Sequence, residues 1–552
     1  MVRTRVFGVL LSMVLLGAAA ASPAAAAGPG DKGQLDCQGQ QSGDTCNGLT
    51  EQQRNALYAI ARDTWHFYDR SVGVDANTHL PLDNIGFQGA PAKGTYTSPT
   101  NIGVYMWSIV AAVDLHLISM NEGRQRLAEL LTTVEHLEKW HGLLFSWYDT
   151  TTAHHIDHPA PNSTDLNGQD PTGQFMSAVD NSWYAAGLVI TRQAVPQLKG
   201  RATALLDAID LGLFYDSRTP QTDVLADSNG TSSGPNDTAG QQYGGWMANQ
   251  GPAGFHYGIL NTETRIGAYV GIGTNKMPGD VWWRTWRTFR PGAYFAWQNQ
   301  VPQGTDVTYR DPRSSKLFKV FEGHFSESSI QFVPSWGGSQ FEALMPNLVE
   351  PETTWGPHSF GLNDRNYALA EIAYASRARQ SPVWGFSPSS TPDDTGNYIA
   401  WAAHNLATNP SLIDYQDGAV SPHASFLALD VLPQEAFANI QKLRSLYPHV
   451  YGSYGFYDAV CPGPTNCTYN SNGTIYTTTP GQIGHRYLVL DQAMIMAALD
   501  NALVNRAMQC HFSSDPVGAA ARPYLAMETF SAQRSTAPGS STPVGLPCGE
   551  RG

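Results

Sequence analysis

The sequence of 552 residues is poor in cysteine and in charged residues. Its six cysteines are too few to hold so long a chain together, which excludes the small secreted folds that depend on a disulfide scaffold. Only 14% of the residues are charged, and the acidic ones prevail to give a net charge of -14. Because nucleic acids require a basic face on the protein that binds them, we expect no nucleic-acid partner.

Long hydrophobic runs are also missing beyond the first residues. Arg3 and Arg5 precede an apolar stretch over residues 6–21, and small residues continue to Ala27, which is the pattern of a secretory signal peptide. No later segment has the roughly 18 uninterrupted apolar residues that a membrane span requires, so we expect no stable membrane insertion. The sequence therefore predicts a signal peptide over residues 1–27 and a secreted protein, extracellular or periplasmic.

The spacing of the cysteines suggests local disulfides, which form in an oxidising compartment. The expected pairs are Cys37 with Cys46, Cys461 with Cys467, and Cys510 with Cys548. Free buried thiols are the alternative, because sequence alone does not establish connectivity. No group of cysteines resembles a zinc site.

Aromatic residues, by contrast, are plentiful, with 14 Trp, 24 Tyr and 21 Phe. The stretch Tyr451-Gly-Ser-Tyr-Gly-Phe-Tyr-Asp458 places aromatics and glycines around one carboxylate. Aromatic side chains bind the apolar faces of sugar rings, whereas carboxylates bind hydroxyl groups or exchange protons. The alternative is an aromatic turn that only packs in the core. The composition favours a large globular body with a cleft for an uncharged polymer.

Helical periodicity dominates the chain, and convincing period-2 strands are few. Thr50 is a good N-cap for a first helix beginning at Glu51. Further helices are predicted near 101–120, 123–141, 180–196, 200–212, 263–272, 364–379, 422–429, 433–447 and 488–507. Long irregular connections such as 142–178, 290–335 and 380–421 separate them, and loops of this length usually carry function. The pattern predicts an all-α dominated toroid in which the loops of one rim form a cleft.

We expect one catalytic domain over residues 48–512, because no linker rich in proline and serine occurs before about residue 530. An N-terminal leader over residues 28–47 precedes it. A C-terminal tail over residues 513–552 follows it and is expected to be attached through Cys548.

Several segments in the second half of the chain follow one another in a distinctive order. They are Ser335-Trp-Gly-Gly-Ser-Gln-Phe-Glu-Ala-Leu-Met-Pro346, Trp384-Gly-Phe-Ser-Pro-Ser-Ser390, Asp417-Gly-Ala-Val-Ser-Pro-His423, the stretch ending at Asp458, and His485-Arg-Tyr-Leu-Val-Leu-Asp491-Gln492. This succession resembles the glycoamylase-like domain family, which includes endo-β-1,2-glucanases and the transglycosylating domain of cyclic β-1,2-glucan synthases. The resemblance extends more loosely over residues 50–330, where Asp180 and Glu263 look like the family's acidic residues at helix starts.

The resemblance implies an (α/α)6 barrel and chemistry at a glycosidic bond, with Glu263 as general acid and Asp458 as general base. One carboxyl group must be protonated to assist the leaving oxygen, and the other must be ionised to activate water. Burial would raise the pKa of the acid, whereas a more polar setting would keep the base charged. The alternatives are stabilisation of a helix N-terminus for Glu263 and a structural role for Asp458.

The remaining motif residues are candidates for binding the sugar. They are Asp180, Trp336, Glu342, Trp384, Asp417, Tyr454, Phe456, Tyr457 and Asp491. Capping or buried ion pairing is the alternative for Asp180 and Glu342, and core packing is the alternative for the aromatic residues. Asp491 matches the family's closing helix, and we expect it to form hydrogen bonds within the site.

A metal site was considered at His154-His155-Ile-Asp157-His158, where imidazoles and a carboxylate lie close together. In a polar loop such residues are ordinarily solvated, so we expect neither a metal nor another cofactor. The sequence thus predicts a secreted glycoside hydrolase that cleaves β-1,2-glucan or a related polysaccharide internally. A transglycosylase, a hydrolase of another glycan and a non-catalytic glycan-binding protein are the alternatives.

Overall fold

The computed structural model describes residues 47–86, 93–156, 174–219, 238–291, 298–409 and 415–539. Its α-helices are α1 (Glu51–Trp65), α2 (Pro99–Asp114), α3 (Met120–His136), α4 (Ala178–Ala194), α5 (Lys199–Ala208), α6 (Ile266–Gly273), α7 (Asp280–Arg284), α8 (Gln340–Leu344), α9 (Glu352–Trp355), α10 (Phe360–Arg377), α11 (His423–Leu427), α12 (Pro433–Leu446), α13 (Val489–Leu503), α14 (Ala507–Ser513), α15 (Pro516–Ala519) and α16 (Arg522–Met527).

Most strands are short and lie in the connections between helices. They are β1 (Asn84–Gly86), β2 (Lys93–Gly94), β3 (Tyr96–Thr97), β4 (Lys139–Trp140), β5 (Leu143–Leu144), β6 (Tyr148–Asp149), β7 (Phe175–Ser177), β8 (Gln242–Tyr243), β9 (Gly245–Met247), β10 (Gly251–Pro252), β11 (His256–Tyr257), β12 (Gln303–Arg310), β13 (Leu317–Glu327), β14 (Ile330–Phe332), β15 (Ser389–Ser390), β16 (Tyr398–Trp401), β17 (Tyr415–Gln416), β18 (Tyr451–Gly452), β19 (Gly455–Phe456), β20 (Ala459–Val460), β21 (Cys467–Ser471), β22 (Thr474–Thr478), β23 (Ile483–Gly484) and β24 (Arg486–Leu488).

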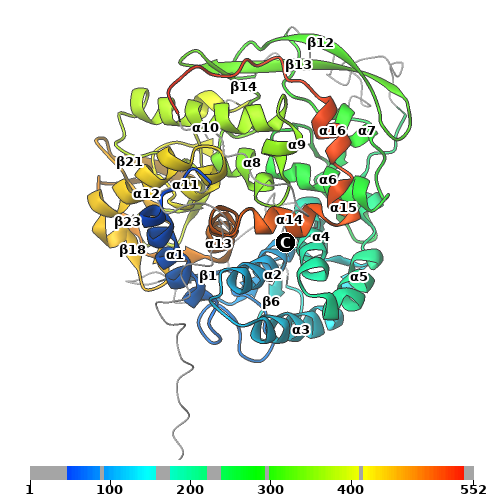
Figure 1. Ribbon diagram of the computed structural model, residues 1–552, viewed down its shortest axis with the longest axis horizontal. Helices are drawn as coiled ribbons and strands as arrows, with labels where there is room; N and C mark the ends of the chain where they lie inside the picture. The colour runs from blue at the N-terminus through cyan, green and yellow to red at the C-terminus, as the bar shows by residue number, and fades with distance from the viewer. Residues whose placement is uncertain are drawn as a thin grey trace, which may run out of the picture.

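Six helices follow one another around the middle of the molecule (Figure 1). Helix α2 contacts α4, and α4 contacts α6. The 3₁₀ turn Glu263–Arg265, which leads into α6, contacts α8. Helix α8 contacts α11, α11 contacts α13, and α13 returns to α2. Helices α2 and α13 are buried along almost their whole length, as this central position requires.

Other helices pack on the outside of this ring. Helix α1 lies against α13, α3 against α2, α5 against α4, α10 against α8, and α12 against α11. An outer helix buries only one face: in α3 the buried residues are Gly123, Leu127, Leu130, Leu131 and Val134, at the spacing of an amphipathic helix. The protein is helix-rich, so the coarse prediction of the fold class is confirmed.

The first predicted helix begins where its cap places it. The Gln53 N–H donates to Thr50 Oγ1 at 3.3 Å, and the Thr50 N–H donates to Gln53 Oε1 at 2.8 Å. This reciprocal capping satisfies amide groups that the first helical turn leaves without a partner. Ser98, Ser119 and Ser177 cap α2, α3 and α4 through their side chains.

A long β-hairpin is the main departure from the predicted elements. Strands β12 and β13 pair from Gln303 opposite His324 to Arg310 opposite Leu317. The prediction of an irregular connection over 290–335 is therefore wrong for this part. Strand β12 is mostly exposed and β13 is mostly buried on successive residues, so neither shows the alternation by which strands are recognised.

One predicted disulfide, between Cys461 and Cys467, is confirmed. Each of the other two predicted pairs includes a cysteine outside the described residues. The predicted signal peptide lies outside them too. In the part of the chain that the structure describes, every helix is too short or too polar to cross a membrane.

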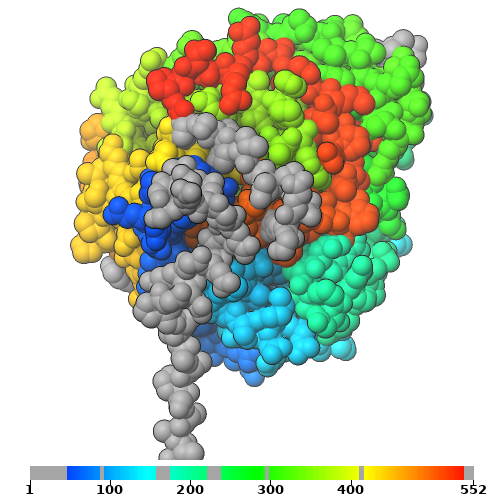
Figure 2. All heavy atoms as spheres, in the orientation of Figure 1, coloured from blue at the N-terminus to red at the C-terminus, as the bar shows by residue number. Residues whose placement is uncertain are grey.

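The described residues 514–539, which follow Ser513, pack on the helical body. Helix α15 contacts α6, and α16 contacts α9, so this segment runs along the surface of the molecule (Figures 1 and 2). Glu528 forms a fully buried ion pair with Arg287 and accepts a hydrogen bond of 2.9 Å from Trp282 Nε1. The first part of the predicted tail is thus held to the domain by a buried charge pair.

We expect Glu528→Ala to lower the free energy of unfolding by about 3–5 kcal/mol, because the buried guanidinium of Arg287 loses its carboxylate partner. Urea denaturation would measure this loss. The control is Glu129→Ala, which removes a partly exposed pair with Arg70 and should cost less than about 1 kcal/mol. Equal losses in the two variants would contradict the importance of the buried pair.

Candidate active site

Strand β24 brings three acidic residues into one place. The Asp458 N–H donates to the carbonyl of Arg486 on β24 at 3.0 Å. On the other side of β24, the Val489 N–H donates to the carbonyl of Asp83 at 2.9 Å. Helix α13 begins directly after β24 and carries Asp491 in its first turn. Short backbone contacts around one strand therefore collect carboxyl groups from distant parts of the sequence.

Asp458 and Asp491 form a buried carboxyl pair, with exposed fractions of 2% and 3%. Burial and the neighbouring Asp491 raise the pKa of Asp458 well above its usual range. Burial, with a contribution from Asp83, raises the pKa of Asp491 to about 7. Since adjacent carboxylates repel each other, the pair holds one proton near neutral pH and carries one negative charge.

The oxygens of this carboxyl pair differ in their hydrogen-bond partners. Asp458 Oδ2 accepts a hydrogen bond of 2.5 Å from the Ser390 N–H, while Asp458 Oδ1 has no hydrogen-bond partner among the described residues. His423 at the start of α11 places Nδ1 3.0 Å from Asp491 Oδ2 and Nε2 2.7 Å from Ser387 Oγ. Burial lowers the pKa of His423 to about 4, so its imidazole is neutral at neutral pH.

Tyr398 links this pair to the predicted acid. It stands opposite Ser390 in the pairing of β15 with β16, next to the amide that binds Asp458. More than half of the residue is exposed, at 54%, yet burial of its hydroxyl and the carboxyl groups of Asp491, Asp458, Asp83 and Glu263 raise its pKa well above the usual value. The charges of these four carboxyl groups therefore all act on the hydroxyl of Tyr398.

Glu263 is the first residue of the 3₁₀ turn before α6 and is partly exposed. Burial of its carboxyl group, followed by the charges of Glu342 and Asp180, raises its pKa to about 8. The turn is fixed by Arg265, which binds the fully buried Glu352 through Nε at 2.7 Å and Nη2 at 2.8 Å. Glu263 is thus a rigidly placed carboxyl group that remains protonated at neutral pH.

Glu342, which the motif made a sugar-binding candidate, is engaged by its own loop. Its carboxylate accepts hydrogen bonds from the N–H of Gly337 at 2.9 and 3.1 Å and of Ser339 at 3.0 Å. The hydroxyls of Ser335 and Ser339 donate to it at 2.8 and 2.9 Å. This geometry supports the capping alternative, in which Glu342 shapes the loop and acts on Glu263 through its charge.

Asp180 lies on the first turn of α4 and accepts a hydrogen bond of 2.5 Å from Thr100 Oγ1. Its charge contributes to the raised pKa values of Glu263 and Tyr257. Asp180 therefore belongs to the part of the site around Glu263, the predicted general acid.

The predicted aromatic residues divide into two groups. Tyr454 and Tyr457 are partly exposed and pack on Tyr487, with ring centroids 5.4 and 4.5 Å away. Phe456 and Trp384 are buried in the core, where the Trp384 carbonyl accepts from the α12 residue Asn439. The two tyrosines are available to a ligand, whereas the two core residues stabilise the fold.

Two further candidates, Trp336 and Asp417, are not among the residues whose charges act on Tyr398 or that pack on Tyr487. Trp336 is partly buried against Phe289, with the ring centroids 6.5 Å apart. Asp417 accepts a hydrogen bond of 2.6 Å from Tyr374 Oη on α10 and pairs at 3.3 Å with Arg379, which follows the end of α10. The contacts of Asp417 give it a structural partner on an outer helix.

Sequence reasoning missed Asp83 and Tyr398 as site residues and gave His423 no role. Asp83 and Tyr398 stand outside the motifs that carry the family resemblance, and only the pairing of β1 with β24 and of β15 with β16 places them. His423 is the last residue of the motif Asp417–His423 and the first residue of the short helix α11. Neither position indicates in the sequence that its side chain contacts Asp491. An alternation signal was not available for strands of two to four residues.

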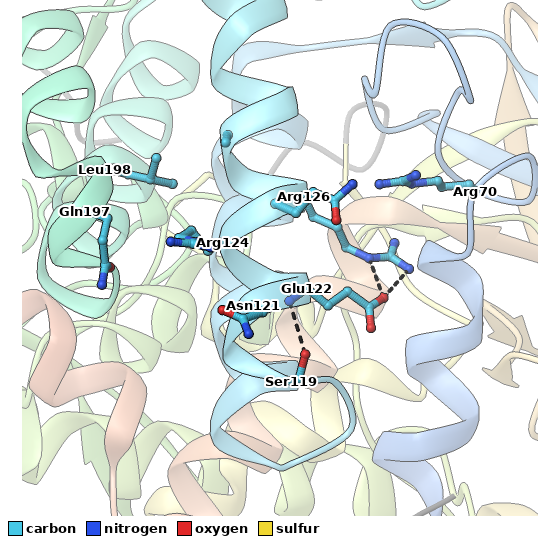
Figure 3. Close-up of a pocket in the computed structure, with 10 residues that line it drawn as sticks. Arg70, Ser119, Asn121, Glu122, Arg124, Arg126, Gln197 and Leu198 are labelled. Atoms are coloured by element: carbon cyan, nitrogen blue, oxygen red, sulfur yellow. Dashed lines mark hydrogen bonds and ion pairs between the residues drawn. The ribbon is translucent and has the colours of Figure 1, made fainter. Parts of the chain in front are cut away.

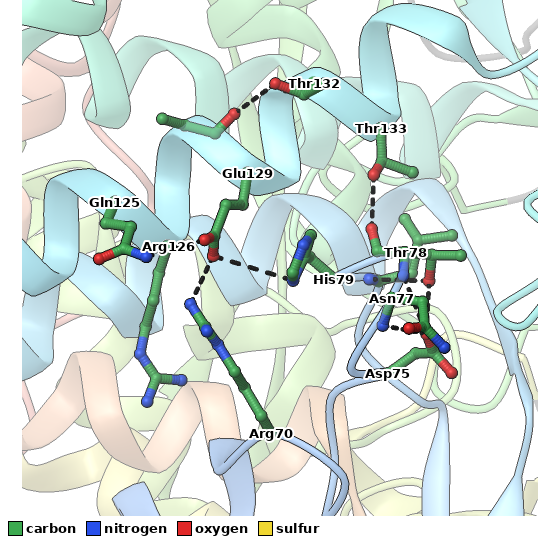
Figure 4. Close-up of polar contacts among 12 residues, drawn as sticks. Arg70, Asp75, Asn77, Thr78, His79, Gln125, Arg126, Glu129, Thr132 and Thr133 are labelled. Atoms are coloured by element: carbon green, nitrogen blue, oxygen red, sulfur yellow. Dashed lines mark hydrogen bonds and ion pairs between the residues drawn. The ribbon is translucent and has the colours of Figure 1, made fainter.

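A groove of about 940 Å³ lies on the outer surface beside α3 (Figure 3), and its lining residues include none of the carboxyl groups with raised pKa described above. Its lining residues include Arg126, which pairs with Glu122, and Arg70, which pairs with Glu129 (Figure 4). These are surface ion pairs and involve none of the residues around Tyr398. The structure does not test the metal site that the sequence considered and set aside, because Asp157 and His158 lie outside the described residues; His155 pairs with Glu138.

Comparisons with known proteins agree with the motifs. Residues 270–515 match a family model described as "Putative glucoamylase", and residues 59–224 match one described as "Protein of unknown function (DUF3131)". The cyclic β-(1,2)-glucan synthase NdvB of Rhizobium meliloti is 24% identical over 542 residues, covering 85% of this chain and 18% of that protein. The chain therefore spans less than a fifth of this relative's length.

Solved structures share the fold. A putative glucoamylase from Bacteroides caccae superposes with a TM-score of 0.59 at 18% identity, covering 86% of this chain and 99% of the other. An endo-β-1,2-glucanase from Chitinophaga pinensis, in complex with sophorotriose and glucose, superposes with a TM-score of 0.56 at 16% identity, covering 86% and 98%. Because residues 270–515 match the glucoamylase family model, the resemblance that the motifs predicted is confirmed.

The raised pKa of Glu263 predicts a stability effect. The folded state holds its proton up to about pH 8, whereas the unfolded chain loses it near pH 4.5, so the folded state loses stability as the pH rises between these values. We expect Glu263→Gln to remove this loss and to raise Tm relative to wild type at pH 8 but not at pH 4. The control Asp207→Asn, at an exposed position of α5, should show no such pH-dependent difference. A Tm difference that is the same at both pH values would contradict the buried proton.

Proposed function

We propose that this protein is a secreted glycoside hydrolase with an (α/α)6 barrel, which cleaves β-1,2-glucan or a related polysaccharide internally. One observation carries the proposal: a carboxyl group that stays protonated, Glu263, shares the surroundings of Tyr398 with a carboxyl pair that carries a negative charge. Hydrolysis of a glycosidic bond needs a proton donor and a proton acceptor in this arrangement.

In the proposed reaction, Glu263 donates its proton to the leaving glycosidic oxygen. The Asp458–Asp491 pair, with its one negative charge, accepts a proton from the attacking water through Asp458, so the pair becomes neutral and holds two protons. Both groups are side chains of the protein, so the reaction requires no cofactor. The hydroxyl of Tyr398 is acted on by the charges of both acid and base, and in the proposed reaction it contacts the reacting sugar or the water.

The binding of a glucan chain is supported by the groups around these carboxyls. The partly exposed rings of Tyr454 and Tyr457 offer apolar faces to sugar rings, and Asp180 offers an acceptor for hydroxyl groups near Glu263. The complex of the Chitinophaga pinensis endo-β-1,2-glucanase with sophorotriose supports β-1,2-glucan as the substrate. The ring formed by α2, α4, α6, α8, α11 and α13 supports the (α/α)6 barrel.

Secretion is supported by the sequence of residues 1–27 and by the disulfide between Cys461 and Cys467, since disulfides persist in oxidising compartments. A second candidate function is transfer of a glucan segment to a sugar acceptor. The similarity to a cyclic β-(1,2)-glucan synthase favours it, and it would use the same acid and base with a sugar hydroxyl in place of water.

The test is to incubate the purified protein with a panel of β-glucans and to identify the products by mass spectrometry in ¹⁸O-labelled water. We expect oligosaccharides from β-1,2-glucan that carry one ¹⁸O at the new reducing end. Glu263→Gln and Asp458→Asn should each lower kcat by about 10²–10⁴-fold, because each removes one partner in proton transfer. Asp207→Asn on the exposed face of α5 should retain wild-type activity.

The outcomes of this test separate the alternatives. Longer or cyclic products without ¹⁸O would establish the transferase. Binding of glucan without any product, in wild type and variants alike, would establish a non-catalytic binding protein and overturn the hydrolase. Products from another β-glucan alone would overturn only the linkage.

The acid also sets the pH dependence. Because Glu263 must be protonated and its pKa is raised to about 8, kcat/KM should fall about tenfold per pH unit above pH 8. We expect the residual activity of Glu263→Gln to lack this alkaline decline. A wild-type decline that instead begins near pH 5 would show that Glu263 is ionised at neutral pH and is not the acid.

A further inference from the structure

Three buried polar atoms converge at the carboxyl pair. His423 Nδ1, one oxygen of Asp458 and one of Asp491 lie within 4.8 Å of one another. The exposed fractions of these residues are 2%, 2% and 3%. Among the described residues, His423 Nδ1, Asp458 Oδ1 and Asp491 Oδ2 have no hydrogen-bond partner outside this group of three. Buried polar atoms usually have one, so this convergence requires an explanation.

The opposite atoms of two of these side chains are held by serines. His423 Nε2 lies 2.7 Å from Ser387 Oγ, and Asp458 Oδ2 accepts the Ser390 N–H at 2.5 Å. When the His423 Nε2–H donates to Ser387, the Nδ1 lone pair points toward the two carboxyl groups. Outer contacts of this kind fix the tautomer and the orientation of side chains that bind metal ions.

The local charge also favours a cation. The charge of Asp83 also acts on Asp491, and Arg486, which binds Asn84 at 2.9 Å, is the basic group that acts on Asp83. A neutral imidazole lone pair beside carboxylate oxygens is stabilised by a positive charge between them, which a shared proton or a metal ion supplies. One nitrogen and two carboxylate oxygens are a ligand set that Zn²⁺ and similar ions accept, with water completing the coordination.

We propose that His423, Asp458 and Asp491 form a binding site for a divalent transition-metal ion of the Zn²⁺ type. The ion would be held through His423 Nδ1 and one oxygen of each aspartate. An ion in this place would occupy the oxygens that accept the proton from water, so it would inhibit hydrolysis. Metal binding stands without the proposed function, and only the inhibition rests on it.

The binding test uses the full chain after treatment with a chelator and dialysis. Isothermal titration with Zn²⁺ should show one tight site per chain, and Co²⁺ should give the visible absorption of a bound ion. His423→Gln should weaken Zn²⁺ binding by more than about 100-fold, because one ligand is lost. Ser387→Ala, which removes only the outer contact of His423, should weaken it about tenfold.

His511→Gln is the matched control, because His511 Nε2 also lies beside a carboxylate, 2.7 Å from Asp114 Oδ2, but without a third ligand. It should bind Zn²⁺ as wild type does. Melting curves without metal establish that each variant is folded, and the Tm of wild type should rise with Zn²⁺ because the site exists only in the folded chain. Absence of a tight site in wild type, or unchanged affinity in both His423→Gln and Ser387→Ala, would overturn the proposal and leave a shared proton as the occupant of the site.

Activity distinguishes the two proposals. If wild type cleaves β-1,2-glucan, Zn²⁺ at saturation should abolish cleavage, and excess chelator should restore it. Cleavage that is unaffected by bound Zn²⁺ would overturn the inhibition. If wild type cleaves no glucan but binds Zn²⁺ through His423, the proposed function fails while the metal site stands.

Discussion

Neighbouring carboxyl groups that are removed from water cannot all ionise, and this constraint governs the centre of the molecule. Asp458 and Asp491 lie side by side almost without exposure, and their raised pKa values express the cost of charging them. Such a site destabilises the folded state, so stability has to come from elsewhere. The almost completely buried helices α2 and α13, which pack on each other beside the site, provide that stability through apolar contact.

The acidic residues of the site differ in how their oxygens are satisfied, and this difference separates structure from chemistry. Glu342 receives donors from its own loop on both oxygens and fixes the backbone there. Asp458 keeps one oxygen bound by Ser390 and one without a partner among the described residues. A carboxylate whose oxygens are all bound by hydrogen-bond donors has a structural role. A carboxylate with one buried oxygen that no donor binds can accept a proton or a cation. The motif that contains Glu342 therefore positions its neighbours and leaves the reaction to them.

Much of the helical scaffold could be predicted from the sequence, because caps such as Thr50 and the apolar periodicity of α3 and α12 are local signals. The glycoamylase-like resemblance could be recognised because its motifs occur in order along the chain. The hairpin of β12 and β13 could not be predicted from the sequence, since neither strand alternates between buried and exposed residues. The catalytic and binding roles of the predicted residues remain proposals. Asp83 and Tyr398 join the site through pairing of very short strands, which is a long-range property that no local pattern contains.

Strand β24 closes the chain on itself: the Arg486 guanidinium donates to Asn84 across 402 positions of sequence. Contacts of such range form slowly, because the chain must lose the entropy of a long loop before they stabilise anything. The cluster of Asp83 with the carboxyl pair therefore assembles only after nearly all of the domain has left the ribosome and β1 has met β24. Partly synthesised or nicked chains that lack β24 would have most of the helices but no reactive centre, so the appearance of activity would report completed folding of the whole domain.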